Sequence, residues 1–323
     1  MKIVICGAGA VGSFYGGLLA RAGQDVHFLA RGAQLDALRT TGLHISSLSL
    51  GDIHLPPLRA THDAAEIGRA DLVLIAVKAH QTAAVLDDVE TMCGPETLLM
   101  ALQNGLEPDE LLAARFGSRR VVSAVVYVGA TLERPGFVRH VAAGTLIIGD
   151  RGGVGADRIE RVRAALASTG LPVRVTNEID RQRWHKLMWN ASFNAISALT
   201  LRSSQDLLAT PASRALVIDV MREVIAVAQA RGVSLGQADI DQIVAATEKA
   251  APIRTSMLVD RERGRPLETE AIVGVVLRRG AESGVPTPIT SVLYALLSAI
   301  SAEGGPARQL PPLAADAFSP QYP

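Results

Sequence analysis

A glycine-rich turn close to the start of the chain restricts the possible folds more than any other feature. Residues 7–12 read Gly-Ala-Gly-Ala-Val-Gly, directly after the apolar run Ile3–Cys6 and at the start of a helical segment. The first glycine allows a tight turn, the second lets the backbone approach a pyrophosphate, and the third permits close packing of helix on strand. Phosphates are favoured there because the first N–H groups of a helix and its dipole attract anions. The alternative is a simple packing turn. The turn predicts a dinucleotide site made by Gly7, Ala8, Gly9, Ala10, Val11 and Gly12.

Strand-like and helical segments alternate through the first half of the chain. Short continuous apolar runs are typical of strands that are covered on both faces. Their alternation with helical segments predicts a mostly parallel sheet with right-handed crossovers, which is an α/β fold of the Rossmann type. The apolar runs lie at Ile3–Cys6, Val26–Ala30, Leu72–Val77, Leu98–Leu102 and Val121–Val126, the helical segments at Val11–Ala22, Gln81–Met92 and Pro108–Phe116, and later strands at Phe137–Val141, Leu146–Gly149 and Val173–Val175.

The second half of the chain has a different pattern, which stays helical from about residue 178. Its first candidate helix, Arg181–Leu199, is long and mostly apolar. With 323 residues, the chain has the length of about two domains. The predicted organisation is a dinucleotide-binding domain at 1–176, an all-helical domain at 177–303 and a loose, proline-rich tail at 304–323.

Charge and cysteine content exclude several classes of protein. Lys plus Arg and Asp plus Glu both number 32, so the formal net charge is zero, which argues against non-specific binding of nucleic acid. Two cysteines, Cys6 and Cys93, are too few for a disulfide framework and fit a reducing, cytoplasmic setting. No apolar run reaches the roughly 18 residues of a membrane span. We therefore expect no membrane partner. No His or Cys pair has the spacing of metal ligands, so we also expect no metal.

The end of the second strand run indicates which dinucleotide is bound. An NAD site usually has Asp or Glu there, to accept hydrogen bonds from the ribose hydroxyls. Residues 28–32 read Phe-Leu-Ala-Arg-Gly, without an acid, and Asp25 lies at the beginning of the strand instead. The guanidinium of Arg31 suits a 2′-phosphate, and Lys78, at the end of another strand run, would add a second positive charge. We therefore expect NADP(H), the alternative being that Arg31 is simply solvated.

Three polar residues line one face of the long candidate helix. Lys186, Asn190 and Asn194 are spaced by four residues in a largely apolar segment. Such groups are costly to bury unless something polar faces them. A partly buried lysine has a lowered pKa and can protonate a carbonyl oxygen as a hydride arrives, while amides can hold substrate oxygens. The alternative is a solvated or inter-domain face.

Together these features resemble the ketopantoate reductase (2-dehydropantoate 2-reductase) family, within the 6-phosphogluconate-dehydrogenase-like group of two-domain enzymes. The resemblance spans about residues 1–300 and is specific through the order and spacing of its motifs. The motifs are Gly7-x-Gly9-x-x-Gly12, Arg31-Gly32, Val77-Lys78, Gln103-Asn104-Gly105, the Lys186/Asn190/Asn194 stripe, Ser256-Met257-Leu258, and Glu268 before Gly284-Val285-Pro286-Thr287-Pro288.

The resemblance implies a role for each matching residue. Lys186 matches the family's general acid. Asn104 matches the asparagine at which nicotinamide and substrate meet, and Glu268 matches a carboxylate that helps to hold the closed ternary complex with the cofactor. The residues that match substrate ligands are Asn190, Asn194 and Ser256.

Two segments depart from the family's pattern. Residues 127–130, which end at Ala130, match the loop near the nicotinamide only loosely. The loop Leu201–Ser204 lacks the amide of a ketopantoate pocket, so either Ser204 replaces it or the pocket accepts a different 2-oxo acid.

The expected function is NADPH-dependent reduction of a 2-oxo acid, in the first place 2-dehydropantoate to pantoate. The alternatives are a related NADP-dependent enzyme for another 2-oxo or 3-hydroxy acid, and an NADP(H) sensor without turnover. The apolar helices of the second half are compatible with a homodimer.

Overall fold

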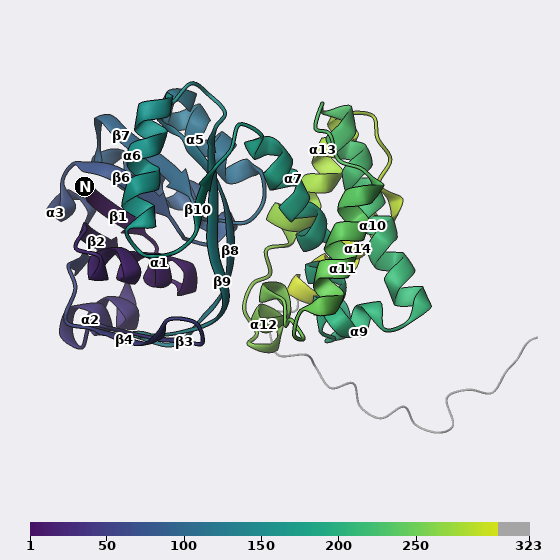
Figure 1. The fold of residues 1–323 in the computed structure, drawn as a ribbon, viewed down its shortest axis with the longest axis horizontal. Coiled ribbons are helices and arrows are strands. Elements are labelled where there is room, and N and C mark those ends of the chain that lie inside the picture. The colour runs from purple at the N-terminus through teal and green to yellow at the C-terminus, as the bar shows by residue number, and fades with distance from the viewer. Residues whose placement is uncertain (303–323) are drawn as a thin grey trace, which may run out of the picture.

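Two domains lie side by side in the computed structural model, which describes residues 1–302 (Figure 1). In the described residues all strands belong to the first domain, and the second is built of helices. The last strand ends at Val175 and the next helix begins at Ile179. The proline-rich tail expected at 304–323 lies outside the described residues.

The elements of the first domain are these strands and helices: β1 (Lys2–Cys6), α1 (Ala10–Arg21), β2 (Asp25–Leu29), α2 (Gly32–Thr40), β3 (Leu43–Ser47), β4 (Gly51–Leu55), β5 (Ala60–Thr61), α3 (Ala64–Ile67), β6 (Ala70–Ile75), α4 (Leu86–Thr91), β7 (Cys93–Ala101), α5 (Glu107–Phe116), β8 (Val122–Arg134), β9 (Phe137–Asp150), α6 (Ala156–Ala167) and β10 (Val173–Val175). The helices of the second domain are α7 (Ile179–Trp189), η4 (Asn190–Asn194), α8 (Ala195–Thr200), α9 (Ser204–Leu208), α10 (Pro211–Ala230), α11 (Gln237–Lys249), α12 (Ser256–Glu262), η5 (Glu270–Gly274), α13 (Val275–Glu282) and α14 (Pro288–Ala302).

A parallel sheet with the strand order β5-β2-β1-β6-β7 forms the centre of the first domain. In β1, Ile3 and Ile5 pack into the core on one face of the sheet, and Val4 and Cys6 pack into a separate core on the other face. The expected α/β fold of the Rossmann type, followed by a helical domain, is confirmed. The chain runs from β1 to β2 on one side and later to β6 on the other. The carboxyl end of β1 is therefore the point where the strand order reverses, and ligands bind at such points.

A second sheet has the strand order β10-β9-β3-β4, with β8 paired to β9. The run Val121–Val126 lies mainly in β8, which is antiparallel to β9, and it joins the parallel sheet only through one parallel bridge between Val121 and Leu99 of β7 in the described residues. The separate strands expected at Phe137–Val141 and Leu146–Gly149 are one strand, β9, which continues through a register shift near Ala143. β8 and β9 lie on the side of the first domain that faces the helical domain (Figure 1).

Helix α1 passes between the two sheets and has a glycine toward each. An added Cβ at Gly16 would lie 2.6 Å from the Phe28 ring, and one at Gly17 would lie 2.6 Å from a methyl group of Leu43. Phe28 belongs to the parallel sheet and Leu43 to the second sheet. Because neither glycine has room for a side chain, close packing on both sides holds the helix that begins at the glycine-rich turn.

The long helix expected at Arg181–Leu199 is present, but it is not a regular α-helix. Between α7 and α8 the chain forms the π-helical segment η4, so the helix widens over Asn190–Asn194. A second π-helical segment, η5, contacts η4. The sequence did not indicate this widening, which falls at the residues that carry the amides. Such segments are rare and occur frequently at functional sites.

Two shorter stretches also differ from the sequence prediction. The helix expected at Gln81–Met92 is broken into two 3₁₀ turns, Ala79–Gln81 and Ala83–Val85, followed by α4. In the helical domain, α12 begins at Ser256 and was not expected as a helix. The 3₁₀ turns directly follow Lys78, in the loop after β6, and α12 carries Asp260, which contacts Lys78.

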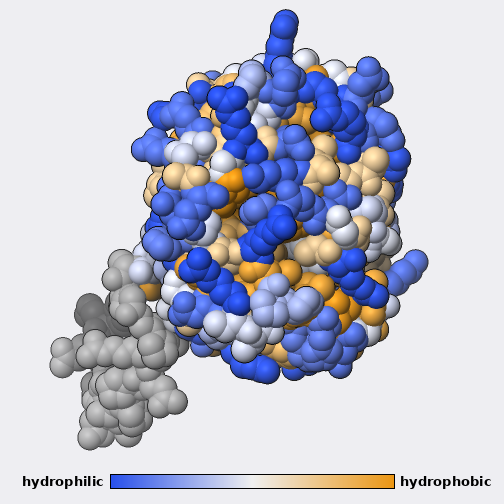
Figure 2. All heavy atoms as spheres, turned by 90° about the vertical axis from the view of Figure 1, so that its left-hand side faces the viewer, coloured by the Kyte–Doolittle hydropathy of each residue, from blue (hydrophilic) through white to orange (hydrophobic). Residues whose placement is uncertain are grey.

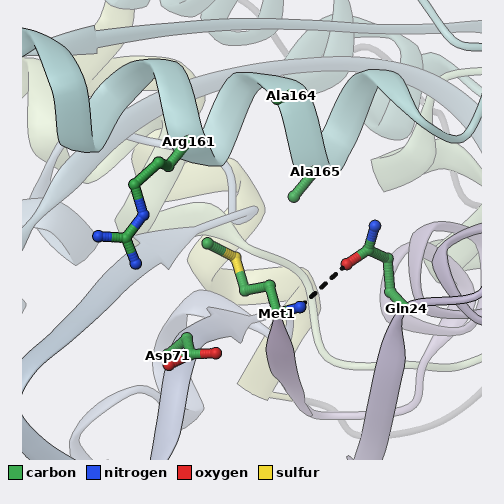
Figure 3. A pocket seen from close by; sticks show the side chains of 6 residues that line it. All are labelled: Met1, Gln24, Asp71, Arg161, Ala164 and Ala165. Atoms are coloured by element: carbon green, nitrogen blue, oxygen red, sulfur yellow. Dashed lines mark hydrogen bonds between the residues drawn. The ribbon is translucent and has the colours of Figure 1, made fainter.

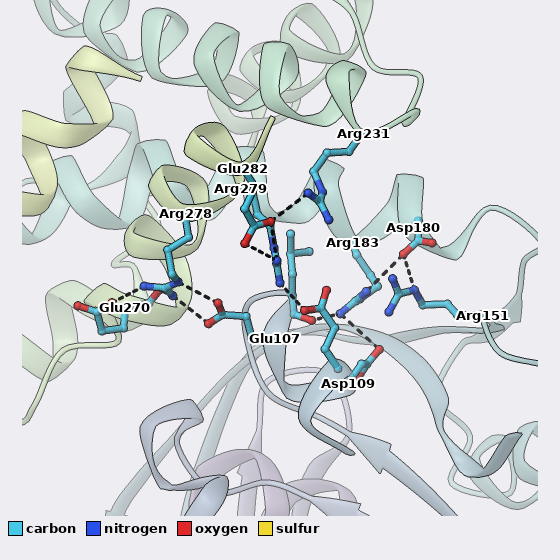
Figure 4. Close-up of polar contacts among 12 residues, drawn as sticks. Glu107, Asp109, Arg151, Asp180, Arg183, Arg231, Glu270, Arg278, Arg279 and Glu282 are labelled. Atoms are coloured by element: carbon cyan, nitrogen blue, oxygen red, sulfur yellow. Dashed lines mark hydrogen bonds and ion pairs between the residues drawn. The ribbon is translucent and has the colours of Figure 1, made fainter. Parts of the chain in front are cut away.

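Ion pairs join the two domains at their junction (Figure 4). Arg278 of α13 binds Glu107 of α5 through two hydrogen bonds of 2.9 Å. The buried Arg183 of α7 lies 3.4 Å from Asp109 of α5 and also donates to the carbonyl oxygen of Leu106. The acidic first turn of α5 thus meets arginines of the helical domain, and its negative charges also suit the positive end of the helix dipole.

The end of the molecule formed by the first domain is mainly hydrophilic, and hydrophobic residues appear there as separate patches (Figure 2). Among residues 1–302, no helix combines the length and the hydropathy that crossing a membrane would require.

Candidate active site

The glycine-rich turn leaves open space above one of its glycines. Gly7 has a φ of +102°, and a Cβ there would lie 2.7 Å from the backbone nitrogen of Val77. A Cβ on Gly12 would lie 2.0 Å from the carbonyl oxygen of Gly7. At Gly9, by contrast, no heavy atom of residues 1–302 other than those of its chain neighbours lies within 4 Å of an added Cβ. Because Gly9 is the N-cap of α1, this open space is at the N-terminus of a helix and fits the pyrophosphate of a dinucleotide.

The loops that follow β6 and β7 meet at the same carboxyl edge of the parallel sheet. The side-chain amide of Gln103 donates to the carbonyl oxygen of Val77 at 2.9 Å and to the hydroxyl of Thr82 at 2.8 Å. These bonds tie the loop that carries Asn104 to the loop that carries Lys78. Both residues therefore lie at the edge where open α/β sheets bind ligands.

Lys186 reaches from the helical domain to the Asn104 turn of the first domain. Its Nζ donates to Oδ1 of Asn104 at 2.9 Å, and Nδ2 of Asn104 donates to Oε2 of Glu268 at 3.2 Å. The ammonium also lies 5.9 Å from the centre of the Tyr127 ring. A cation on one side and a carboxylate on the other thus set the orientation of the Asn104 amide. The structure brings together Lys186, Asn104 and Glu268 from three distant segments of the chain.

Lys78 extends this chain of polar contacts. Its Nζ lies 2.7 Å from Oδ2 of Asp260 and 3.4 Å from Oε2 of Glu268, and both carboxylates are buried. The N–H of Ala79 donates to the other oxygen of Glu268 at 3.2 Å. Asp260 is a site residue that sequence reasoning missed. It lies one helical turn after Ser256 in α12, a spacing that places both on one face of the helix.

Burial and charge act in different directions on the pKa values of these groups. Burial lowers the pKa of Lys186 to about 8, against a smaller effect of Glu268 that raises it. Burial alone would lower the pKa of Lys78, but Glu268 and Asp260 outweigh it and raise that pKa. Burial would raise the pKa of Glu268, but Lys78 and the hydrogen bonds to the carboxylate lower it below its usual value. Near neutral pH the site holds a charged carboxylate and a lysine that gives up its proton readily.

A small cavity lies beside Lys186, between the two domains. Asn104, Lys186 and Asn190 form its polar side, and Ala124 and Val125 of β8 belong to its apolar side. Lys186 and Asn190 are one helical turn apart, just before and at the start of the π-helical segment. An ammonium and two amides therefore border one small cavity between the domains, and such convergent polar groups are what fixes the orientation of a bound small molecule.

Four other expected site residues do not line this cavity. Asn194 is buried in η4, and its Oδ1 has no hydrogen-bond partner among the described residues. Ser204 is buried and donates to the side chain of Gln205 at 2.8 Å. Ser256 is exposed at the start of α12, and Ala130 lies in β8 at a register shift. The polar stripe of the long helix reaches the cavity only through its first two members.

Arg31 follows the carboxyl end of β2 and is tied to the glycine-rich turn. It is the N-cap of α2, and Gln34 of that helix donates to the hydroxyl of Ser13 at 3.1 Å. Ser13 in turn donates to the carbonyl oxygen of Ala8 at 2.9 Å. The guanidinium lies 3.2 Å from the carboxylate of Asp88 in α4. Arg31 and Lys78, which were expected to share one phosphate, therefore pair with different carboxylates.

A second hollow lies at the opposite edge of the parallel sheet (Figure 3). Its lining includes Met1, Gln24, Asp71 and Arg161. The Met1 amino group lies 3.5 Å from the side-chain oxygen of Gln24, and Asp71 accepts the backbone N–H of Lys2 at 2.8 Å. None of the expected site residues lies here. We place the site at the carboxyl edge, where parallel sheets bind their ligands.

Comparison with known proteins agrees with this geometry. A family model described as "Ketopantoate reductase PanE/ApbA" matches residues 3–153, and its C-terminal counterpart matches residues 178–301. A 2-dehydropantoate 2-reductase from Mesorhizobium japonicum is 32% identical over 94% of this chain and 99% of its own length. The crystal structure of 2-dehydropantoate 2-reductase from Geobacter metallireducens has a TM-score of 0.88 at 36% identity, covering 93% of this chain and 99% of that one.

A more distant neighbour shares the fold. The ternary structure of D-mandelate dehydrogenase with NADH and anilino(oxo)acetate has a TM-score of 0.87 at 22% identity, over 94% of this chain and 99% of that one. The resemblance inferred from the motifs is confirmed by the two family models, which together cover most of the chain. The chain belongs to the ketopantoate reductase family, whose named members are oxidoreductases that act on CH–OH groups.

Proposed function

We propose that this protein reduces a 2-oxo acid with NADPH, in the first place 2-dehydropantoate to pantoate, and that Lys186 is the general acid. The observation that carries the proposal is the contact of Lys186 with Asn104 at 2.9 Å across the two domains, beside a cavity and within the chain of contacts that ends at Glu268. A lysine with a pKa near 8 is protonated at neutral pH and still acidic enough to protonate a developing alkoxide.

In this proposal the first domain binds the cofactor and the helical domain supplies the proton donor. When bound, NADPH supplies the hydride that reduces the ketone carbon. The N–H groups at the start of α1, above Gly9, hold the pyrophosphate, and Arg31 holds the 2′-phosphate. Lys186 donates its proton to the carbonyl oxygen, and Asn104 holds the ammonium in place for that transfer. Holding these groups in line is a large part of what such a site contributes to the rate.

The other polar residues orient the substrate and the domains. Asn190 faces the cavity and is positioned to hold a substrate oxygen. We assign Asn194 and Ser256 to the substrate as well, on the strength of the family resemblance. Glu268 joins a loop of the first domain through Ala79 and Asn104, and in this way stabilises the closed arrangement.

Other functions are compatible with the same fold. The D-mandelate dehydrogenase of similar fold was solved with NADH and anilino(oxo)acetate, so a reductase of another 2-oxo acid, or a 3-hydroxy acid dehydrogenase, is the main alternative. An NADP(H) sensor would need neither Lys186 nor its contact with Asn104. The homodimer and the cytoplasmic location stay predictions.

A panel of 2-oxo acids tests the proposed function directly. Full-length protein is mixed with NADPH and one acid at a time, and the loss of NADPH absorbance is followed. We expect turnover with 2-dehydropantoate at a higher kcat/KM than with pyruvate, 2-oxoisovalerate or phenylglyoxylate. A higher value for phenylglyoxylate would move the assignment to the mandelate type, and NADPH binding without turnover of any acid would indicate a sensor.

The rate of reduction should fall at alkaline pH. The reaction needs the protonated form of Lys186, and burial lowers the pKa of this side chain to about 8. We therefore expect kcat/KM for reduction to be level up to about pH 7 and to fall about tenfold per pH unit above pH 8. Oxidation of the hydroxy acid by NADP⁺ needs the neutral amine and should show the opposite slope. Reduction that is flat from pH 6 to 10 would contradict the assignment.

A further inference from the structure

An acidic side chain lies where the sequence of β2 lacks one. The carboxyl end of β2 carries Arg31 and no Asp or Glu, but Asp88 reaches the same place from α4. Its Oδ2 lies 3.2 Å from Nη2 of Arg31, and the two residues are 57 positions apart in the chain. The Asp88 side chain is 32% exposed and the Arg31 side chain 72%, so the pair is open to solvent and to ligands.

Both charges lie close to the cofactor edge of the sheet. Burial raises the pKa of the Cys6 thiol to about 12; the charge of Asp88 acts in the same direction and that of Arg31 in the opposite one. Cys6 ends β1 and directly precedes the glycine-rich turn. Arg31 is held to that turn through α2, and Asp88 lies in the first turn of α4, where the helix dipole favours a carboxylate.

We propose that Asp88 determines coenzyme preference. Its carboxylate pairs with the Arg31 guanidinium that the 2′-phosphate of NADPH must bind, and so weakens the binding of NADPH relative to that of NADH. The inference rests on the proposed function and deepens it. A 2′-phosphate carries about −1.5 to −2 charges and is repelled by a carboxylate beside its binding group. The 2′-hydroxyl of NADH is neutral and can donate a hydrogen bond to the same carboxylate. The pair Arg31–Asp88 therefore narrows the preference for NADPH that Arg31 alone would give.

The test compares two neighbouring aspartates of α4. Dissociation constants of NADPH and NADH are measured for the wild type, Asp88→Asn and Asp87→Asn by titrating the fluorescence of the reduced nicotinamide. Asp87→Asn is the matched control, because it removes the same charge from the same helix turn while Asp87 pairs with Arg115 instead of Arg31. We expect Asp88→Asn to raise the affinity ratio of NADPH to NADH about tenfold, as the removal of one nearby charge in water predicts, and Asp87→Asn to change it less than about twofold.

A variant of the partner completes the test. Arg31→Ala should weaken the binding of NADPH and hardly affect that of NADH. In this background, Asp88→Asn should raise the affinity ratio of NADPH to NADH less than in the wild type, because no guanidinium is left to release. An unchanged ratio in Asp88→Asn, or equal changes in both aspartate variants, would overturn the inference while leaving the proposed function intact. A wild-type protein that binds neither nucleotide would instead overturn the proposed function and this inference with it.

Discussion

Replacing Lys186 with Ala is expected to lower kcat for reduction of the 2-oxo acid by at least about 100-fold, the usual scale for the loss of a general acid. Among the described residues that line the cavity, only Lys186 and Arg183 carry a positive charge. The guanidinium of Arg183 is already bound to Asp109 and to the carbonyl oxygen of Leu106. Without Lys186, the oxygen that accumulates charge during hydride transfer has to take its proton from water. Stopped-flow absorbance of NADPH at saturating substrate measures this step.

Two controls separate the loss of an acid from the loss of the fold. Lys249→Ala removes the same side chain from an exposed position at the end of α11 and should leave kcat within about twofold, as surface substitutions do. NADPH should bind the Lys186 variant about as well as it binds the wild type. Near-normal turnover of Lys186→Ala would exclude this residue as the acid.

Gly9→Val is expected to weaken NADPH binding strongly while leaving the protein folded. In the described part of the chain, no heavy atom beyond the neighbouring residues lies within 4 Å of a Cβ at Gly9. Its φ of −71° suits any residue, so there is room for the new side chain. That side chain would fill the space that the pyrophosphate needs. If two charge-assisted hydrogen bonds at about 1.5 kcal/mol or more each are lost, affinity falls on the order of 100-fold. Calorimetric titration with NADPH and the thermal unfolding midpoint are the two measurements.

Gly12→Val is the contrasting variant of the same turn. A Cβ there would lie 2.0 Å from the carbonyl oxygen of Gly7, so this change should lower the unfolding midpoint as well as weaken NADPH binding. An unfolding midpoint that drops equally in both variants would show that Gly9 is needed for packing and not for a ligand. NADPH affinity that survives Gly9→Val would place the dinucleotide elsewhere.

The sequence allowed the central sheet to be predicted well because its strands are covered on both faces, which leaves continuous apolar runs. The same signal was ambiguous at Val121–Val126. Val122, Ala124 and Val126 pack into the core of the first domain, while Val125 packs against Ile179 on the other face. A strand that is buried on both faces has the same continuous apolar sequence whether its neighbour is parallel or antiparallel. The pairing of this strand was therefore not available from its pattern.

The site was predictable in its parts and not in its assembly. Lys186 and Asn190 followed from polar residues on an apolar helix, and Asn104 from the family resemblance of the motif Gln103-Asn104-Gly105. The widening at η4 involves only five residues, too few for periodicity to reveal it. Asp260 resembled an ordinary charged residue of a surface segment, since its partner Lys78 lies 182 positions away. Contacts of that separation depend on how the domains meet, which local pattern does not describe.

The junction of α5 with α7 and α13 bears on how this chain can be recombined with its relatives. Arg183 is buried, and it pairs with Asp109 of the other domain at 3.4 Å and with Asp180 of its own helix at 3.3 Å. A chimera that joins this helical half to a foreign dinucleotide-binding half would keep the half-exposed Asp180 but lose Asp109, which is the buried counter-charge of the guanidinium. Removing one partner of a buried ion pair is strongly destabilising. The exchangeable unit is accordingly larger than either half alone: a functional transplant of the Lys186 helix has to carry the acidic turn of α5 with it.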